Sequence, residues 1–269
     1  MKNFIIKIFV VMIFLSISAS GQTKFTPSFY YTYGDYSNQN YSNSFAGYAT
    51  LAIKNADFIT GAFERLNINN DEWKYAQTML TAGYTKTIYP FYVKLNYSHV
   101  MGEFDYLPFP FTYKEFLNVY NASLIYNYYL FYFGASFTYQ DVNGLESVVA
   151  KQFKFNIDWI ALSKITFSIS PLYTTVTDGR ALTSVYAKLK YFPIKLLTIT
   201  LGAMAGKRAY YFDENLLTIF NQDETQKKIY GARFEFNLTE QFKLPIVVQY
   251  SEFETYDIKY FTAGVVLKF

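Results

Sequence analysis

The sequence has no cysteine, one histidine and no apolar run of helix-spanning length. Without cysteine, disulfides and thiolate chemistry are excluded. A single histidine cannot complete a zinc site made of nitrogen and sulfur ligands. No segment beyond the N-terminal stretch approaches the ~18 consecutive apolar residues of a transmembrane helix. Because no glycine-rich nucleotide loop occurs either, we predict neither a cofactor nor a metal site.

The N-terminal residues have the order of a secretory signal peptide. Lys2 and Lys7 supply a positive start, an apolar run follows, and the small residues at 18–21 suit cleavage. This pattern predicts a signal peptide over 1–21, export through the general secretory pathway and a single mature domain over 22–269. Removing the two lysines from 24 basic residues leaves 22 against 21 acidic ones, which indicates no nucleic-acid partner.

Aromatic residues make up 22% of the chain, with 28 tyrosines and 28 phenylalanines, and apolar residues recur at alternate positions. A strand face that carries lysine and aspartate cannot be a dry core, and a face of large apolar groups cannot contact water. Lipid outside and a polar interior satisfy both faces, whereas a secreted β-sandwich or a soluble barrel is the alternative. The segment 151–159 shows the split, with Phe153, Phe155, Ile157 and Trp159 opposing Gln152, Lys154, Asn156 and Asp158.

Fourteen such segments can be counted, and an even number suits a single-chain bacterial barrel. Tight connectors alternate with longer ones along the chain, which places short turns in the periplasm and longer loops outside. The pattern predicts an all-β, transmembrane, antiparallel up-and-down β-barrel. The expected strands start near Lys24, Ser44, Asp57, Trp73, Phe91, Thr112, Leu130, Glu146, Lys164, Ala181, Leu196, Lys227, Phe242 and Ile258.

The last segment, 260–269, alternates to its end and stops on Phe269. A terminal aromatic residue on a closing strand is typical of outer-membrane barrels, where it serves as the signal read by the barrel-assembly machinery. We therefore expect Phe269 to be that signal and the protein to lie in the outer membrane of a Gram-negative bacterium, in contact with its lipid and lipopolysaccharide.

Three short motifs resemble the YaiO-like outer-membrane barrels: YTYGDYS at 31–37, AGKRAYYFD at 205–213 and the closing LKF. The order of the hairpins looks similar over nearly the whole mature chain. The resemblance implies a location and an architecture. It supplies no catalytic residues, because that family offers no defined ones.

Strand phase turns charged residues toward the interior, where seven cations face four anions. If a water path is open, this excess gives a mildly cationic lumen; if the charges pair, they block the interior. Fourteen strands lie between the ~8 that side chains fill and the ~16 that leave an aqueous channel. The inward residues are Lys54, Lys94, Lys154, Lys188, Lys190, Arg208 and Arg233 with Glu64, Glu115, Asp158 and Glu235, beside Asn156.

Two connectors stand out. In 104–113, Leu107, Pro108, Phe109 and Phe111 form a stiff apolar loop that suits a constriction, a contact for lipopolysaccharide or a partner, or an aromatic rim. The longest connector, 213–226, is a candidate cover for the opening. The aromatic run before it, 210–212, is expected in the outer aromatic girdle.

Two outward positions call for explanation. His99 shares its face with Tyr97 and Met101, whereas Ser98 projects to the other face and cannot be its nucleophile. We interpret His99 as an interfacial residue, with a lipid-modifying enzyme as the less favoured alternative. Arg65 also phases outward, which a β-bulge or a side chain extended to the headgroups would explain.

These observations favour a monomeric, non-enzymatic outer-membrane barrel that acts as a passive channel for small polar solutes. The alternative is a sealed structural or assembly barrel that presents its loops to a protein or a surface polysaccharide.

Overall fold

The computed structural model describes residues 24–53, 57–109, 111–220 and 223–269. The expected signal peptide at 1–21, and Lys54, lie outside the described residues. Within the described ranges, no helix is long and apolar enough to cross a membrane.

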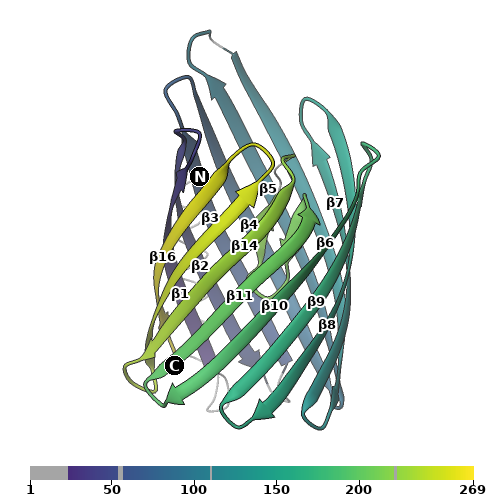
Figure 1. The fold of residues 1–269 in the computed structure, drawn as a ribbon, viewed down its shortest axis with the longest axis vertical. Coiled ribbons are helices and arrows are strands. Elements are labelled where there is room, and N and C mark those ends of the chain that lie inside the picture. The colour runs from purple at the N-terminus through teal and green to yellow at the C-terminus, as the bar shows by residue number, and fades with distance from the viewer. Residues whose placement is uncertain (1–23, 54–56, 110, 221–222) are drawn as a thin grey trace.

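Fourteen antiparallel strands form a closed barrel (Figure 1), as the alternating pattern predicted. The observed starts agree with the expected ones to within three residues, and the largest difference is at β2, which begins at Tyr41 rather than Ser44. The wall strands are β1 Lys24–Tyr36, β2 Tyr41–Ile53, β3 Asp57–Asn69, β4 Trp73–Ile88, β5 Phe91–Tyr106, β6 Phe111–Tyr128, β7 Phe131–Asn143, β8 Ser147–Leu162, β9 Ile165–Val176, β10 Ala181–Ile194, β11 Leu197–Arg208, β14 Gln226–Asn237, β15 Phe242–Phe253 and β16 Asp257–Leu267.

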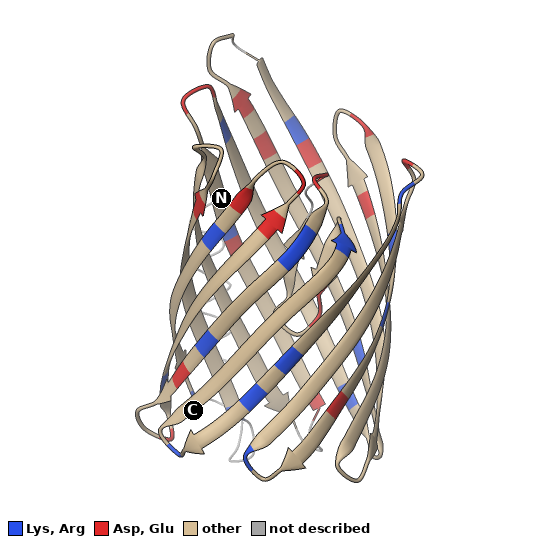
Figure 2. Ribbon diagram, viewed as in Figure 1, with Lys and Arg blue, Asp and Glu red and all other residues tan. Residues whose placement is uncertain are grey.

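The barrel closes between its first and last strands. β1 pairs with β16 from Ser28 opposite Val266 to Tyr36 opposite Ile258. Phe25 and Phe269 exchange backbone hydrogen bonds of 3.1 and 2.9 Å. We call this end, which also carries the tight connectors, the turn end, and the opposite end the loop end. Figure 2 shows most acidic residues near the loop end.

The wall separates apolar from polar side chains as alternation requires. On β8, Phe155 and Trp159 point outward and are 61% and 43% exposed, whereas Gln152 and Lys154 point inward and are 1% and 6% exposed. The outward aromatic residues therefore form a continuous apolar belt around the barrel.

Arg65 lies on the outer face of an unbroken strand. The registers of β3 with β2 and with β4 run without a shift, so the expected bulge is wrong. The Arg65 guanidinium instead donates a hydrogen bond of 2.7 Å to Thr78 Oγ1 on the neighbouring strand. This contact gives the outward cation a polar partner on the wall.

Candidate functional site

A hairpin from the loop end occupies the barrel interior (Figure 1). Between β11 and β14 the chain forms two short strands, β12 Tyr211–Asp213 and β13 Thr218–Phe220, which pair only with each other. Asp213 Oδ1 closes the turn by accepting the backbone N–H groups of Asn215 and Leu216 at 2.9 and 3.2 Å. We call residues 209–225 the lumen hairpin.

Glycine allows the chain to leave the wall. Gly206 has φ +115°, and a Cβ there would lie 2.4 Å from the Thr183 carbonyl oxygen. The β11–β14 register shifts between Ala205 and Arg208, at the same place. In the hairpin, Tyr210 and Leu217 have φ of 48° and 51°, a conformation that costs a non-glycine residue about 1–3 kcal/mol. The contacts of the hairpin with the wall must therefore offset this strain.

Polar contacts attach the lumen hairpin to β7 and β8. The Gln140 side-chain amide donates to the Tyr210 carbonyl oxygen. Gln152 donates to the Phe212 carbonyl at 3.1 Å and accepts from the Phe212 N–H at 3.2 Å. These two amides satisfy backbone groups that would otherwise be buried without partners.

A buried ion pair completes this attachment. Lys154 Nζ lies 2.8 Å from Glu214 Oε1, and the two side chains are 6% and 3% exposed. The pairing neutralises two charges that the low-dielectric interior would penalise singly. Lys154 was predicted to contribute to the charge of an open lumen, but its ammonium group is neutralised by this ion pair with the hairpin.

Apolar packing surrounds these contacts. In the loop-end half, a set of inward apolar residues of the wall packs against Tyr210, Phe212, Leu217 and Ile219 of the hairpin. The expected place of 210–212 in an outer aromatic girdle is wrong, because these rings are 5%, 8% and 1% exposed inside the barrel. The wall residues of this cluster are Ala62, Met79, Val100, Leu117, Val119, Val142, Ala150, Val176 and Leu182.

Arg208 fixes the base of the hairpin. Its Nε donates to Gln226 Oε1 at 2.7 Å, and its guanidinium carbon lies 3.9 Å from the Tyr211 ring centroid. At the loop end, Arg180 donates to the Asp223 side chain at 2.5 Å and to the Asp178 side chain at 2.6 Å. The Arg180 guanidinium holds the pKa of the Asp178 carboxyl below its ordinary value. Burial, with Asp223 nearby, raises the pKa of Tyr210 to about 12.

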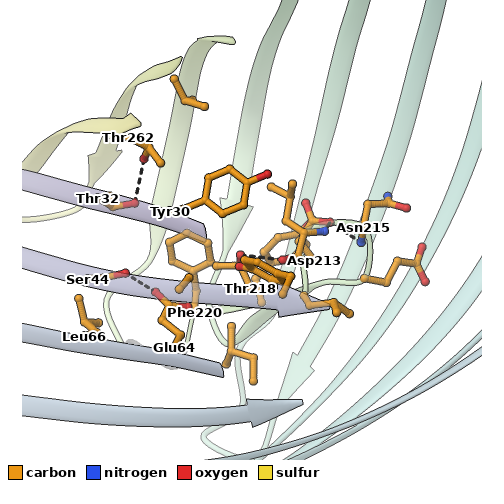
Figure 3. Close-up of a pocket in the computed structure, with 18 of the residues that line it drawn as sticks. Tyr30, Thr32, Ser44, Glu64, Leu66, Asp213, Asn215, Thr218, Phe220 and Thr262 are labelled. Atoms are coloured by element: carbon orange, nitrogen blue, oxygen red, sulfur yellow. Dashed lines mark hydrogen bonds between the residues drawn. The ribbon is translucent and has the colours of Figure 1, made fainter. Parts of the chain in front are cut away.

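Beside the hairpin a cavity of about 620 Å³ remains against β1–β5 and β14–β16 (Figure 3). Hydroxyl groups and tyrosine rings line much of it. Toward the turn end it reaches Thr50, Thr60 and Thr85. Toward the loop end it reaches Tyr36 and Tyr260, which belong to an apolar cluster with Ile68, Phe253 and Ile258. The hairpin therefore leaves part of the interior unfilled.

Four of the predicted lumen residues line this cavity: Glu64, Lys94, Arg208 and Arg233. Lys94 Nζ donates to Asn215 Oδ1 at 3.3 Å, so it contacts the hairpin turn. Arg233 donates to Glu235 Oε2 at 3.0 Å, and Lys243 to the other oxygen of Glu235 at 2.6 Å. Lys188, Glu115, Asn156 and Glu235 are not among the residues lining the cavity.

The remaining lumen residues have other partners. Glu115 accepts a hydrogen bond from the Tyr75 hydroxyl, and Asn156 donates one to Asp158 Oδ2 at 3.4 Å. Lys190 lies within electrostatic reach of Lys188 as well as of Arg233, Glu235 and Lys243. Two cations, Arg233 and Lys243, thus pair with Glu235 on the inner wall near the turn end, and Lys190 lies within electrostatic reach of all three groups.

The proline-containing loop does not enter the barrel. Leu107, Phe109 and Phe111 are 49%, 67% and 50% exposed at the tip of the long β5–β6 hairpin, and Pro108 between them is also exposed. The segment that narrows the lumen is the lumen hairpin.

His99 lies on the outer wall with an amide partner. Its Nδ1 and the Tyr97 hydroxyl each lie 2.9 Å from Asn118 Oδ1. Ser98 is fully buried on the inner face, where its hydroxyl contacts Thr81 Oγ1 at 2.7 Å. Among the described residues, no cluster of three or more His, Cys, Asp or Glu side chains suits a metal ion.

No family model matches the chain, and no curated protein matches it in sequence. Among solved structures it is similar to the deltaS2S3 mutant of TodX, a monoaromatic hydrocarbon channel, with a TM-score of 0.63 and 8% identity over 94% of this chain and 91% of that one. It is also similar to OmpTdeltaL8, an outer membrane protein of Vibrio cholerae lacking loop L8, with a TM-score of 0.52 and 8% identity over 93% and 100% of the two chains. At such identities the likeness shows the fold alone, which is that of the outer-membrane β-barrels.

Proposed function

We propose that the protein is a monomeric barrel of the Gram-negative outer membrane that passes small polar solutes along a path narrowed by the lumen hairpin. The observation that supports this proposal is the hydroxyl-lined cavity beside the hairpin, which reaches from Thr60 near the turn end to Tyr36 at the end of β1. The side chains of Tyr36 and Tyr260 line its loop end, so we expect their rotamer changes to regulate passage.

A mild preference for anions belongs to the same proposal. Near the turn end Arg233 and Lys243 pair with Glu235, and Lys190 lies within electrostatic reach of these groups and of Lys188, so the local charge is positive. A ring of one charge sign favours counter-ions in a narrow path.

Single-channel recording in planar bilayers tests the proposal. We expect small discrete conductance steps and, in a potassium chloride gradient, a reversal potential that indicates chloride preference. The double variant Lys188→Gln/Lys190→Gln should reduce that preference, whereas Lys207→Gln, whose side chain is 59% exposed, should leave it unchanged. A protein that shows no steps under any voltage contradicts the channel.

The second candidate is a sealed barrel that presents its loops to a protein or a surface polysaccharide. It is favoured by the dry packing of the lumen hairpin and by the exposed apolar tip at 107–111. Crosslinking in intact cells, followed by purification, should then recover a constant partner, and substitution of Phe109 by Ser should reduce its recovery.

We further propose that the protein is not an enzyme. His99 has Asn118 to orient its ring, but Met101 and Tyr97 occupy the neighbouring outward positions on its strand. Unchanged membrane lipid profiles in a His99→Ala strain are expected, and an altered acyl-chain composition would contradict this. Membership of the YaiO-like barrels stays a prediction from the sequence motifs.

A further inference from the structure

A niche in the cavity wall lies between a carboxylate and a tyrosine ring. Across β3, β2, β1 and β16, strand pairing sets Glu64 opposite Ala46, Ala46 opposite Tyr30, and Tyr30 opposite Gly264. A Cβ at Gly264 would lie 2.4 Å from the Tyr30 ring, so the ring lies toward β16. The methyl group of Ala46 is therefore the floor of a gap between Glu64 and Tyr30.

The lumen hairpin faces this niche. Figure 3 shows Glu64 and Tyr30 reaching into one space from the wall, with Thr218 and Phe220 of the hairpin beside them. Tyr48, on the same inner face as Ala46, contacts Tyr30 edge to face, with ring centroids 5.6 Å apart and an interplanar angle of 83°. Two rings and one carboxylate thus border the same enclosed volume.

Glu64 has no counter-ion in the part of the chain that the structure describes. Its Oε1 accepts the Ser44 hydroxyl at 2.7 Å, and no lysine or arginine nitrogen lies within ion-pair distance. The other carboxylates that line the cavity already have hydrogen-bond or ion-pair partners. Glu214 pairs with Lys154, and Asp213 accepts the turn N–H groups and the Tyr211 hydroxyl.

The cavity cations do not compensate Glu64 either. Arg208 stacks on Tyr211 and donates to Gln226. Arg233 pairs with Glu235 and also donates to the Tyr30 hydroxyl, on the side of that ring away from Glu64. Lys94 lies opposite Thr85 near the turn end, whereas the β5 residue in the row of Glu64 is Val100. An ionised carboxylate in an enclosed cavity is stabilised by a charged partner, and the wall supplies none.

We propose that this niche, formed by Glu64, Ala46, Tyr30 and Tyr48, binds a small organic ammonium ion. The carboxylate supplies the opposite charge, and the tyrosine faces supply the cation–π contact that ammonium groups favour. A calcium ion is a poorer occupant, because it takes six to eight oxygen ligands and the niche offers a single carboxylate. The inference does not rest on conduction, since a sealed barrel with an accessible cavity binds the same ion.

Calorimetric titration of the refolded barrel in dodecyl maltoside tests this inference. Choline chloride is the probe, and 3,3-dimethylbutan-1-ol is its uncharged counterpart of the same shape. We expect choline to bind, the neutral alcohol to bind at least about tenfold more weakly, and Glu64→Gln to weaken choline by a similar factor. Glu64→Asp should retain part of the affinity, and Tyr30→Leu should lower it.

The control is Glu103→Gln, which changes a carboxylate 48% exposed at the loop end and should leave choline binding unchanged. Heat-modifiable migration on gels verifies that each variant folds. Absence of choline binding to the wild-type barrel overturns the inference. Equal binding of choline and the alcohol, or unchanged binding by Glu64→Gln, also overturns it and leaves only a site for neutral polar molecules. Single-channel recordings report on the channel separately, so the two proposals can fail independently.

Discussion

Lys154 and Glu214 meet where both side chains are almost completely buried, between the barrel wall and the lumen hairpin. Replacing one partner leaves the other charge in a dry interior, at a cost of about 3–5 kcal/mol. We expect Lys154→Met to release the hairpin, which faster proteolysis within 209–225 would reveal. The double variant Lys154→Met/Glu214→Leu should restore protection, because apolar residues of similar size replace the pair.

Lys114 and Glu103 provide the matched control. They lie 3.6 Å apart with side chains 63% and 48% exposed, so their pairing is screened by solvent. Lys114→Met should leave the hairpin protected. Equal proteolysis of Lys154→Met and the wild-type protein would show that the buried pair does not hold the hairpin.

Asp178 and Arg180 give a pH-dependent contact outside the membrane-spanning strands. Because Arg180 lowers the pKa of Asp178 in the folded protein, the pair adds stability above the unfolded pKa and loses it as pH falls through the folded pKa. We expect Arg180→Ala to raise the pKa of the Asp178 carboxyl back toward its ordinary value, measured by NMR titration of labelled aspartate. Arg180→Lys should keep part of the shift. An unchanged titration in the alanine variant contradicts this account.

Strand phase was sufficient to place single residues on a face. It predicted His99 and Arg65 outside, and the structure agrees. Their partners Asn118 and Thr78 lie on neighbouring strands, so finding them requires the register between strands. Local alternation contains no information about register, which is why these contacts were not predicted.

At the scale of elements, the wall strands were predictable and the lumen hairpin was not. The fourteen strands are long enough for alternation to be read, whereas β12 and β13 have three residues each. Their docking depends on Gln140 and Gln152, which lie far away in sequence and resemble any other inward polar residue. One signal was available: Leu117 and Val119 alternate with Phe116 and Tyr120, so both faces of β6 are apolar. A strand of that kind indicates a dry contact inside as well as lipid outside.

Removing the hairpin tests its role as the constriction. We expect a chain with 211–220 replaced by a short glycine–serine link, and carrying Lys154→Met, to conduct several-fold more than the wild type in planar bilayers. Deleting 107–109 from the exposed β5–β6 tip is the control and should leave conductance unchanged. Equal conductance with and without the hairpin would show that the narrowest point lies elsewhere.

At the scale of the whole molecule, the apolar belt requires a hydrocarbon surrounding. Phe155, outward on β8 and 61% exposed, lies in that belt, whereas Phe109, 67% exposed, lies at a loop tip. We expect Phe155→Arg to destabilise the barrel in lipid vesicles by about 2–4 kcal/mol, measured by urea titration. Phe109→Arg should change stability by less than about 0.5 kcal/mol. Similar effects of the two substitutions would contradict a membrane-embedded belt.

Closure of the barrel followed from the even number of strands and from the alternation of short and long connectors. The contents of the barrel interior could not be predicted from these features. The inward charges left two interpretations open, a cationic lumen with a water path and an interior blocked by paired charges, and the structure places Lys154 and Arg208 in buried contacts with the hairpin. Strand phase placed Lys94, Lys154 and Arg208 on the inner face, where the structure has them. What these charges contact depends on the lumen hairpin, whose position no periodicity of the sequence indicates.

The lumen hairpin is continuous at both ends with adjacent wall strands, β11 and β14. If the hairpin detaches from β7 and β8, it therefore stays covalently attached to the barrel. Its rebinding is an intramolecular event, for which the effective concentration of the hairpin is on the order of millimolar. A free peptide or solute that competes for the same inner-wall contacts must reach a concentration comparable with this effective concentration. The equilibrium between the bound and the detached hairpin is therefore independent of how many copies of the protein the membrane holds.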